Sequence, residues 1–252
     1  MTVHWLLLTA TVRAPTSVRV SVADPVARAG QYRAAISEWR RLAPALGARI
    51  AVVENSGAAE DELFADVAGV PGSPPPVLLR AEQGDPRRGK GAMEADMIDQ
   101  ALAQLEVAPG ELVAKCTGRL VVPNAARAVP PFAAGAGERA PAIVLRATLG
   151  GSYVDTRLLV ATTSAWSDVL AGMAQEVDED AGHFLEHVVA DRVHLGRSRQ
   201  ALAVHRFRQR PRFAGYSGTS GERYDTPAGR LRRVAGAPVE ALLRRLPPDK
   251  QF

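Results

Sequence analysis

The 252-residue sequence contains little cysteine and little lysine, and both shortages restrict its chemistry. The single cysteine, Cys116, cannot form a disulfide within the chain, which fits a reducing compartment. Cys116 lies in an apolar strand pattern, so we expect a small buried core residue rather than a nucleophile. Lysine occurs only at Lys90, Lys115 and Lys250, so arginine carries most of the positive charge, and the net charge is +4.

Long hydrophobic runs are also missing. No stretch approaches the roughly 20 apolar residues that a membrane span needs. The apolar run at 5–8 has no basic flank before it and no small-residue cleavage site after it, so we expect a cytoplasmic protein. The length suits one large α/β domain or two small ones.

Several catalytic signatures are absent as well. There is no G-x-x-x-x-G-K-[ST] phosphate loop, and no G-x-G-x-x-G follows the first predicted strand. His183 and His187 are four residues apart, but H-E-x-x-H is missing, so we predict no zinc site. No helix-turn-helix, zinc-finger or RNA-binding signature is present, so we predict no nucleic-acid partner.

Apolar runs and helical spacing alternate through the first half of the chain. Strands are predicted at 5–12, 49–53, 77–79 and 111–122, the last of them interrupted at 117–119, and helices at 30–46, 60–67 and 92–105. This order predicts an α/β fold with a mainly parallel sheet and helices on both faces. In the second half, strands are predicted at 142–148 and 153–162, and helices at 164–176, 178–192 and 239–246. We interpret the Pro-, Ala- and Gly-rich stretch 130–141 as a surface loop within a single domain.

Polar residues follow the first two predicted strands, at the edge where parallel sheets bind their ligands. Thr9 and Arg13 lie at the end of the first strand, and Glu54 and Asn55 at the end of the second. In a nucleotide-binding α/β domain these residues would hold the base and the ribose. Ordinary turn chemistry is the alternative explanation for each of them.

Two further clusters combine glycine with positive charge. Lys90 lies between two glycines and is followed by Glu94, which suits a diphosphate, although a basic flexible loop explains the residues equally well. Lys115 and Arg119 flank Gly118, and a glycine inside a strand marks a bulge or a close ligand approach. Buried cations need an anionic partner, and a phosphate or Glu94 would serve.

Carboxylates supply the candidate general bases that transfer to a hydroxyl requires. Glu186 interrupts an apolar run in the predicted helix 178–192 and is our first choice. Asp180, near the start of that helix, and Asp155 rank behind it, because acids at a helix start more often act as caps.

Taken in order, these segments resemble bacterial glycosyltransferases of capsule and lipopolysaccharide synthesis. The resemblance is carried by Glu54-Asn55-Ser56, Gly89-Lys90-Gly91 with Glu94, Lys115-x-Thr117-Gly118-Arg119 with Asn124, Asp155-Thr156-Arg157, and the loop 215–221. It implies a GT-A-like fold and an enzyme that transfers a sugar from a nucleotide-diphosphate donor. It also implies a glycan or lipid-linked acceptor in surface polysaccharide synthesis.

The resemblance further implies how the chain divides. Residues 1–124 would form the nucleotide-binding half, 142–224 the acceptor and catalytic half, and 225–252 a basic segment that contacts the anionic inner face of the plasma membrane. The implied donor-binding residues are Thr9, Arg13, Glu54, Asn55, Lys90, Glu94, Lys115, Thr117, Arg119, Ser217, Gly218 and Thr219. The implied bases are Glu186, Asp180 and Asp155.

One position departs from the family. Most GT-A enzymes carry Asp-x-Asp there to hold Mn²⁺ or Mg²⁺ on the diphosphate, whereas this chain has Thr117-Gly118-Arg119. We expect Lys90, Lys115 and Arg119 to replace the metal in part or in whole, with Mn²⁺ or Mg²⁺ left open as a cofactor. The departure also allows a degenerate, non-catalytic member of the family.

Two other functions stay open from the sequence. A sugar-phosphate nucleotidyltransferase would need a Gly- and Arg-rich loop directly after the first strand, and 14–20 contains no glycine. A non-catalytic module could instead use the basic C-terminal quarter to bind nucleic acid, with a steep dependence on salt.

Overall fold

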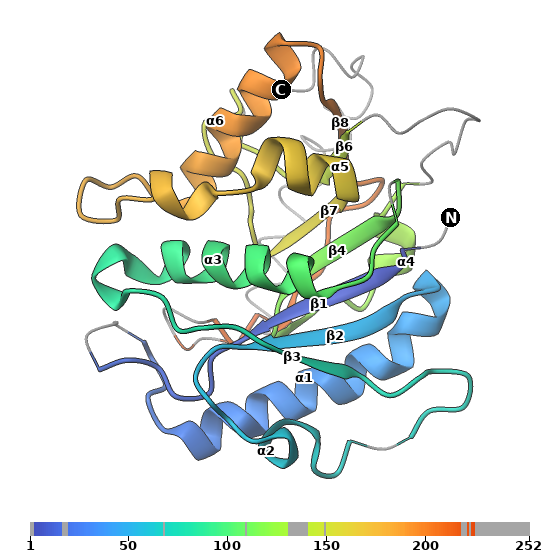
Figure 1. Ribbon diagram of the computed structural model, residues 1–252. Coiled ribbons are helices and arrows are strands. Elements are labelled where there is room, and N and C mark those ends of the chain that lie inside the picture. The colour runs from blue at the N-terminus through green and yellow to red at the C-terminus, as the bar shows by residue number, and fades with distance from the viewer. Residues whose placement is uncertain are drawn as a thin grey trace.

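The computed structural model describes residues 3–16, 20–67, 69–108, 110–130, 141–148, 150–217, 221 and 223–224. Seven strands form its central sheet, in the order β3-β2-β1-β4-β7-β6-β8. Their bounds are β1 Trp5–Ala10, β2 Arg49–Glu54, β3 Val77–Arg80, β4 Leu112–Thr117, β6 Ala142–Leu145, β7 Leu158–Thr162 and β8 Ala203–Arg206. The sheet is mainly parallel and is covered by helices on both faces, which confirms the predicted α/β fold class (Figure 1).

Strand direction decides which segments meet at the ligand-binding edge. β1 runs parallel to β2 and β4, whereas β7 runs antiparallel to both of its neighbours, β4 and β6. The carboxyl ends of β1, β2 and β4 therefore share an edge with the amino end of β7. The backbone N–H of Thr117 donates to the carbonyl oxygen of Arg157 at 3.1 Å, so residues 155–157 lie beside the tip of β4.

The helices divide between the two faces of the sheet (Figure 1). Helices α1 (Pro25–Leu46), α2 (Glu60–Phe64) and α4 (Ala125–Ala128) contribute to the core on one face. Helices α3 (Gly89–Gln104), α5 (Thr163–Ala165) and α6 (Leu185–Ser198) contribute to the core on the other. Each core contains one fully buried tryptophan, and each indole N–H is satisfied by a strand carbonyl: Trp39 donates to Leu120 at 2.8 Å, and Trp166 to Val113 at 3.2 Å.

Helix α1 begins five residues before the predicted start at 30. The carboxylate of Asp24 accepts hydrogen bonds from the backbone N–H groups of Val26 and Ala27, and Pro25 occupies the first turn. This is the N-cap and N1 chemistry that starts helices, and Gly30 is tolerated inside the helix. The helix ends where predicted, because Gly47 adopts the left-handed conformation at its C-cap.

Two helix predictions in the second half were wrong. The predicted helix 164–176 is broken into α5, a π-helical turn at Trp166–Leu170 and a 3₁₀ turn at Met173–Glu176. Thr162 caps the amino end of α5, and Gly172, with φ of 75°, precedes the 3₁₀ turn. The predicted helix 178–192 starts only at Leu185, because Asp178 and His183 form a β-bridge that closes a turn.

The strand predicted at 111–122 is divided near 117–119, as expected, into β4 and β5 (Leu120–Val121). The pairing of β5 with β9 (Ala214–Gly215) in a separate two-stranded sheet was not predicted. Cys116 is fully buried in β4, as expected, and burial raises the pKa of its thiol to about 12. The predicted helix 239–246, the basic segment 225–252 and most of 130–141 lie outside the described residues. Within the described ranges, no helix is both long and apolar enough to cross a bilayer.

Candidate functional site

A cavity of about 780 Å³ opens at the edge of the sheet where β1 and β4 end. Its lining comes from both layers of helices: α1 lies on one side, and α3 and α6 lie on the other. Eight of the residues predicted from the sequence line it: Thr9, Lys90, Glu94, Thr117, Arg119, Asp155, Glu186 and Ser217. The fold therefore brings together residues up to about 200 positions apart in the chain.

A buried ion pair forms the floor of the cavity. The ammonium of Lys115, which is 1% exposed, lies 2.8 Å from a carboxylate oxygen of Glu94. It also donates to the carbonyl oxygen of Thr156 at 2.8 Å and to the hydroxyl of Thr117 at 3.5 Å. The hydroxyl of Thr9 donates to the same Glu94 oxygen at 2.8 Å. This pair joins α3 to β1, β4 and the segment before β7.

The ion pair fixes the charge state of Glu94. Burial would raise the pKa of Glu94, but Lys115 and the two threonine hydroxyls hold it below the ordinary value of 4.5. An ammonium has three N–H donors, and Lys115 places one against each of three protein oxygens. Lys115 is below the cavity lining, so its charge supports the floor and does not itself extend into the cavity.

Two buried arginines form the wall on the α1 side. Arg28 is 4% exposed and Arg119 is 5% exposed, and both line the cavity. Arg28 donates to the carbonyl oxygens of Thr11, at 2.9 Å, and Val22, at 3.2 Å, while Arg119 donates to the side-chain oxygen of Gln31 at 3.0 Å. Neither guanidinium forms a salt bridge with a carboxylate among the residues that the structure describes.

Within the described residues the charge of this wall has no acidic partner, which is unusual for buried cations. Burial, and after it the like charge of Arg28, lower the pKa of Arg119, while the Tyr32 hydroxyl opposes that shift. The guanidinium of Arg119 also lies 5.9 Å from the centre of the Tyr32 ring. Two desolvated guanidiniums on one wall form a site for an anion with two charges.

Arg28 and Tyr32 line the cavity but were not predicted as site residues. Arg28 lies four residues before Tyr32, so both belong to the stripe of α1 that continues through Ala35, Ile36 and Trp39. The missed signal was an arginine at an apolar position of an amphipathic helix, next to the end of the first strand.

Asp155 lines the cavity and is paired with two arginines, Arg146 and Arg157. Its carboxylate accepts from Arg157 at 2.6 and 2.7 Å and lies 3.3 Å from Arg146. Burial would raise the pKa of Asp155, but the two guanidiniums hold it below its ordinary value. Arg157 in turn lies 4.2 Å above the ring of Phe213. A carboxylate held in this way is a weak proton acceptor, so it is better suited to structure than to base catalysis.

Glu186 is a cavity carboxylate that accepts a hydrogen bond from a neutral hydroxyl group rather than from a guanidinium. It lies in the first turn of α6 and accepts a hydrogen bond from the hydroxyl of Thr156 at 3.1 Å. Burial, followed by the neighbouring Glu186 and Asp155, raises the pKa of Tyr153, so the Tyr153 hydroxyl stays a donor at neutral pH. Asp180, by contrast, is exposed in the turn before α6 and does not line the cavity.

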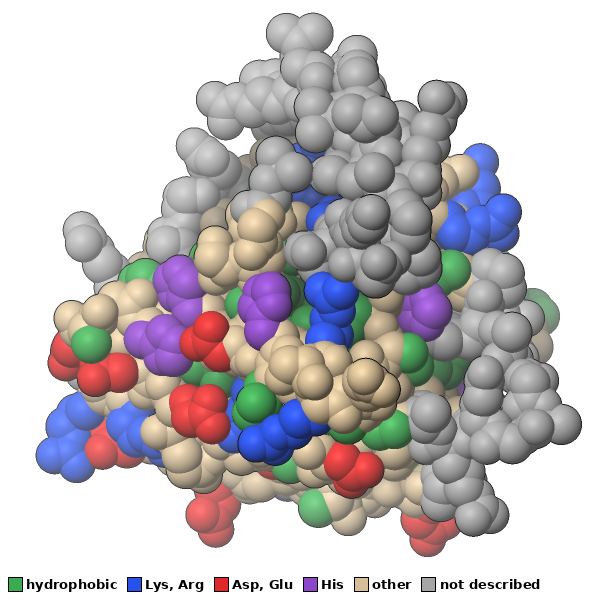
Figure 2. Space-filling view, turned by 90° about the horizontal axis from the view of Figure 1, so that it is seen from above, with side chains coloured by type: hydrophobic (Ala, Val, Ile, Leu, Met, Phe, Trp, Pro, Cys, Tyr) green, Lys and Arg blue, Asp and Glu red, His purple; other side chains and the backbone are tan. Residues whose placement is uncertain are grey.

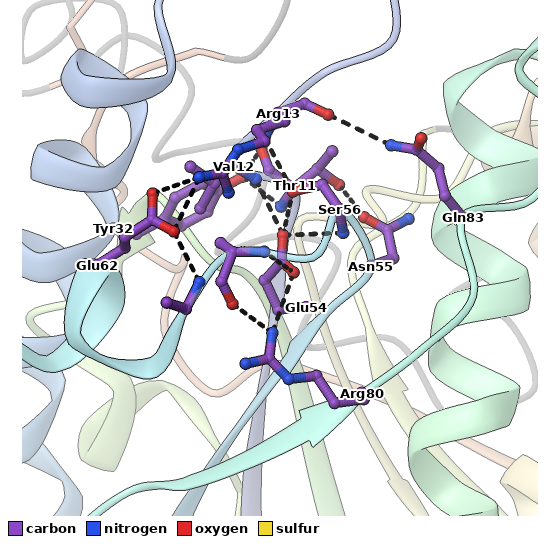
Figure 3. Close-up of polar contacts among 12 residues, drawn as sticks. Thr11, Val12, Arg13, Tyr32, Glu54, Asn55, Ser56, Glu62, Arg80 and Gln83 are labelled. Carbon is purple, nitrogen blue, oxygen red and sulfur yellow. Dashed lines mark hydrogen bonds and ion pairs between the residues drawn. The ribbon is translucent and has the colours of Figure 1, made fainter.

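Three predicted nucleotide-site residues lie beside the cavity rather than in its lining (Figure 3). Glu54 is fully buried and accepts from the backbone N–H groups of Val12, Ser56 and Ala58. These contacts join the turn after β2 to the turn after β1. Glu54 therefore has a structural role that its position at a strand end did not reveal.

Arg13 and Asn55 belong to the same network (Figure 3). Arg13 points outward and pairs with Glu62 at 2.8 Å. Asn55 accepts from the hydroxyl of Thr11 at 2.7 Å, and its buried side-chain N–H₂ has no hydrogen-bond partner in the described part of the chain. Thr11 lines the cavity, whereas Arg13 and Asn55 do not, and Asn55 is linked to the lining through the Thr11 hydroxyl.

The predicted diphosphate loop is the first turn of α3, which begins at Gly89 rather than at 92. The carboxylate of Glu179 accepts from the backbone N–H of Gly91 at 2.7 Å, so an acidic side chain already occupies the end of this helix. Lys90 lines the cavity beside it. Gly218 and Thr219 lie outside the described residues.

The described part of the cavity holds no ready-made cage of protein ligands for a divalent cation. Glu94 is bound to Lys115, Asp155 to Arg157, and Glu179 to a backbone N–H. Across the described ranges, no three His, Cys, Asp or Glu side chains come close enough together to hold a metal. Mn²⁺ and Mg²⁺ favour several oxygen ligands around one point, and these carboxylates face separate protein donors instead.

Gly118 is required where the tips of β1 and β4 meet. A Cβ atom on Gly118 would lie 2.4 Å from the carbonyl oxygen of Thr9 and 3.2 Å from the ring of Tyr32. The close approach expected from the sequence is therefore an approach of backbone to backbone. We expect Gly118→Ala to lower the free energy of unfolding by about 1–3 kcal/mol, measured by urea denaturation. Gly69→Ala, where a Cβ meets nothing within 4 Å, is the control, and equal losses in both variants would contradict this explanation.

Comparison with known proteins gives only distant likenesses. No protein-family model and no curated protein sequence matches the chain. A proposed nucleotide-diphospho-sugar transferase from Desulfovibrio desulfuricans G20 is similar in structure, with 14% identity and a TM-score of 0.44, over 82% of this chain and 80% of that one. A proposed glucose-1-phosphate thymidylyltransferase from Bacillus anthracis, crystallised in complex with sucrose, has 11% identity and a TM-score of 0.38, over 98% and 97%.

Proposed function

We propose that this protein is a glycosyltransferase that binds a nucleotide-diphosphate sugar in the cavity and transfers the sugar to a hydroxyl group. The observation that carries the proposal is the pair of buried guanidiniums, Arg28 and Arg119, which line one wall without an acidic partner in the described residues. A diphosphate carries the negative charge that this wall lacks. All three nitrogens of Arg28 already donate to protein oxygens, so Arg28 contributes mainly its charge, whereas Arg119 also has N–H groups to donate to phosphate oxygens.

The reaction needs one bond made and one bond broken. The acceptor oxygen bonds to the anomeric carbon of the sugar, and the bond from that carbon to the diphosphate oxygen breaks. The bonding pair leaves with the nucleoside diphosphate, and the hydroxyl proton passes to a base. Arg28 and Arg119 stabilise the negative charge that develops on the leaving group, and Glu186 accepts the proton.

The residues on the cavity floor act indirectly in this proposal. Lys115 holds Glu94 and the carbonyl of Thr156, and Thr156 in turn donates to Glu186. These are positioning residues, because they set the distance between the base and the arginine wall. Surface polysaccharide synthesis, a glycan or lipid-linked acceptor and contact with an anionic membrane are finer parts of the proposal, supported by the resemblance alone.

Replacement of the base separates chemistry from donor binding. We expect Glu186→Gln to lower kcat by about 10²- to 10⁴-fold while the Kd for the nucleotide sugar stays within about twofold of wild type. The measurement is nucleoside diphosphate release from a panel of UDP-, GDP-, CDP- and dTDP-sugars, with methyl glycosides as acceptors. Glu106→Gln, at an exposed position just beyond α3, is the matched control.

The products also distinguish the rival enzyme class. A nucleotidyltransferase would consume a nucleoside triphosphate and a sugar 1-phosphate and would release pyrophosphate. If the wild-type protein releases pyrophosphate and Glu186→Gln does so equally, the protein is not a glycosyltransferase and Glu186 is not its base.

A further inference from the structure

Three aromatic rings gather at the mouth of the cavity, on the side opposite the arginine wall. Tyr153 and Phe184 line the cavity and are 39% and 41% exposed, although most large hydrophobic side chains here are buried. The ring of His187 lies 5.4 Å from that of Tyr153, edge-on, and 5.8 Å from that of Phe184. We call these three residues the aromatic shelf.

The aromatic shelf is held in place by its own contacts. The backbone N–H of Phe184 donates to Nδ1 of His187 at 3.2 Å, which ties the residue before α6 to the first turn of the helix. The His187 ring stacks on His183 at 6.0 Å, and His183 is bound to Asp191 at 3.0 Å. Figure 2 shows histidine side chains gathered beside acidic ones on this face. The exposed rings of Tyr153 and Phe184 are therefore packed against His187, which is itself packed against His183.

The charges on the two sides of the cavity differ. The α1 wall carries Arg28 and Arg119 with no acidic partner in the described residues. Across the cavity, the carboxylates of Asp155, Glu179 and Glu186 balance the cations of Lys90, Arg146 and Arg157. A doubly charged phosphate group is favoured at the first wall, whereas the balanced side favours a neutral ligand.

We propose that the aromatic shelf is the acceptor subsite, and that it binds the pyranose ring of a neutral sugar. The C–H groups on one face of such a ring pack against Phe184 and Tyr153, as apolar surface packs on any aromatic face. The hydroxyls at the rim of the ring then reach Glu186, which lines the same cavity and lies beside Tyr153. The inference depends on the proposed function, because it places the attacking hydroxyl between the base and the donor.

The choice of a neutral sugar follows from the acids around the shelf. A phosphorylated acceptor would bring its charge close to Glu186 and Glu179, where like charges repel. An alkyl chain would cover Phe184 equally well, but it would bring no hydroxyl for the Glu186 carboxylate to deprotonate. A polyol with one apolar face satisfies both groups at once.

Saturation-transfer NMR tests the subsite with simple probes. The probes are the methyl pyranosides of glucose, galactose, mannose, rhamnose and N-acetylglucosamine at millimolar concentration, with UDP, GDP and CDP tested separately by thermal shift. We expect at least one pyranoside to bind the wild-type protein and Phe184→Ala to raise its Kd about three- to tenfold. Leu195→Ala removes a similarly exposed side chain (48% exposed) from α6, the helix that Phe184 caps, and is the matched control.

Each outcome gives a separate answer. A pyranoside signal lost in Phe184→Ala and kept in Leu195→Ala, with the nucleotide shift unchanged in both, supports the subsite. No signal from any pyranoside on a wild-type protein that binds a nucleotide overturns the acceptor inference alone. Loss of the nucleotide shift in Phe184→Ala also overturns it, because the ring would then belong to the donor site. Absence of a nucleotide shift in the wild type counts against the proposed function instead, whatever the pyranosides show.

Discussion

Replacing Arg119 with methionine should abolish most nucleotide binding without harming the fold. The guanidinium is desolvated and has no acidic partner among the described residues, so an apolar side chain of similar length removes a cost to the folded state. Its loss also removes charge-assisted hydrogen bonds to the diphosphate. We expect the Kd for a nucleoside diphosphate to rise roughly 10- to 100-fold, while Tm stays equal or increases.

The control for Arg119→Met is an arginine of the same chain that does not line the cavity. Arg87 is exposed and pairs with Asp85 just before α3, so Arg87→Met should leave both nucleotide binding and Tm close to wild type. Titration calorimetry gives the Kd, and a thermal melt gives Tm. A lower Tm in Arg119→Met with unchanged nucleotide affinity would mean that this arginine is structural, and the α1 wall would lose its assigned role.

Lys115→Met should have the largest effect on stability. Removing the ammonium leaves the Glu94 carboxylate on the cavity floor without its counter-ion, which costs about 3–5 kcal/mol in comparable buried pairs. The double variant Lys115→Met with Glu94→Gln removes the stranded charge. It should therefore recover most of the lost free energy of unfolding, measured by urea denaturation at pH 7.

The pH dependence follows from the pKa of Glu94. That pKa is lower in the folded protein than its ordinary value of 4.5, so the contribution of the ion pair is present above that pH. It is lost as the pH falls through the folded pKa, and the penalty of Lys115→Met should shrink in the same direction. The exposed pair of Arg13 and Glu62 is the control, and Arg13→Met with Glu62→Gln should cost less than about 1 kcal/mol. A double Lys115 and Glu94 variant as unstable as the single one would contradict the role given to the pair.

The sequence predicted the layers of the fold and part of the site. The alternation of apolar strands and amphipathic helices in 1–124 was sufficient for a parallel sheet, because each element shows its own periodicity. Polar residues at strand ends were predicted to mark the ligand-binding edge of the sheet. Two of them, Thr9 and Thr117, line the cavity. The second half was harder, because the broken helix at 163–176 and the turn at 178–183 depend on tertiary contacts.

Two features of the site depend on strand direction and on burial. The segment before β7 reaches the cavity because β7 runs antiparallel to β4, and no local pattern in 153–162 reports that direction. Glu54 and Arg13 have the composition of binding residues, yet their partners, Val12 and Glu62, lie in the protein itself. Arg28 shows the converse, since an arginine early in a helix suggests a solvated surface until burial is known.

In the proposed function, the α1 wall binds a nucleoside diphosphate through guanidiniums rather than through a metal. The most direct test is a thermal melt of the wild-type protein with UDP, GDP, CDP, ADP or dTDP in the presence of EDTA. At a hundredfold excess over Kd, one of them should stabilise the fold by about 2.7 kcal/mol and raise Tm by roughly 5–10 °C. A shift that appears only with added Mn²⁺, or no shift with any nucleoside diphosphate, would contradict this role of the α1 wall.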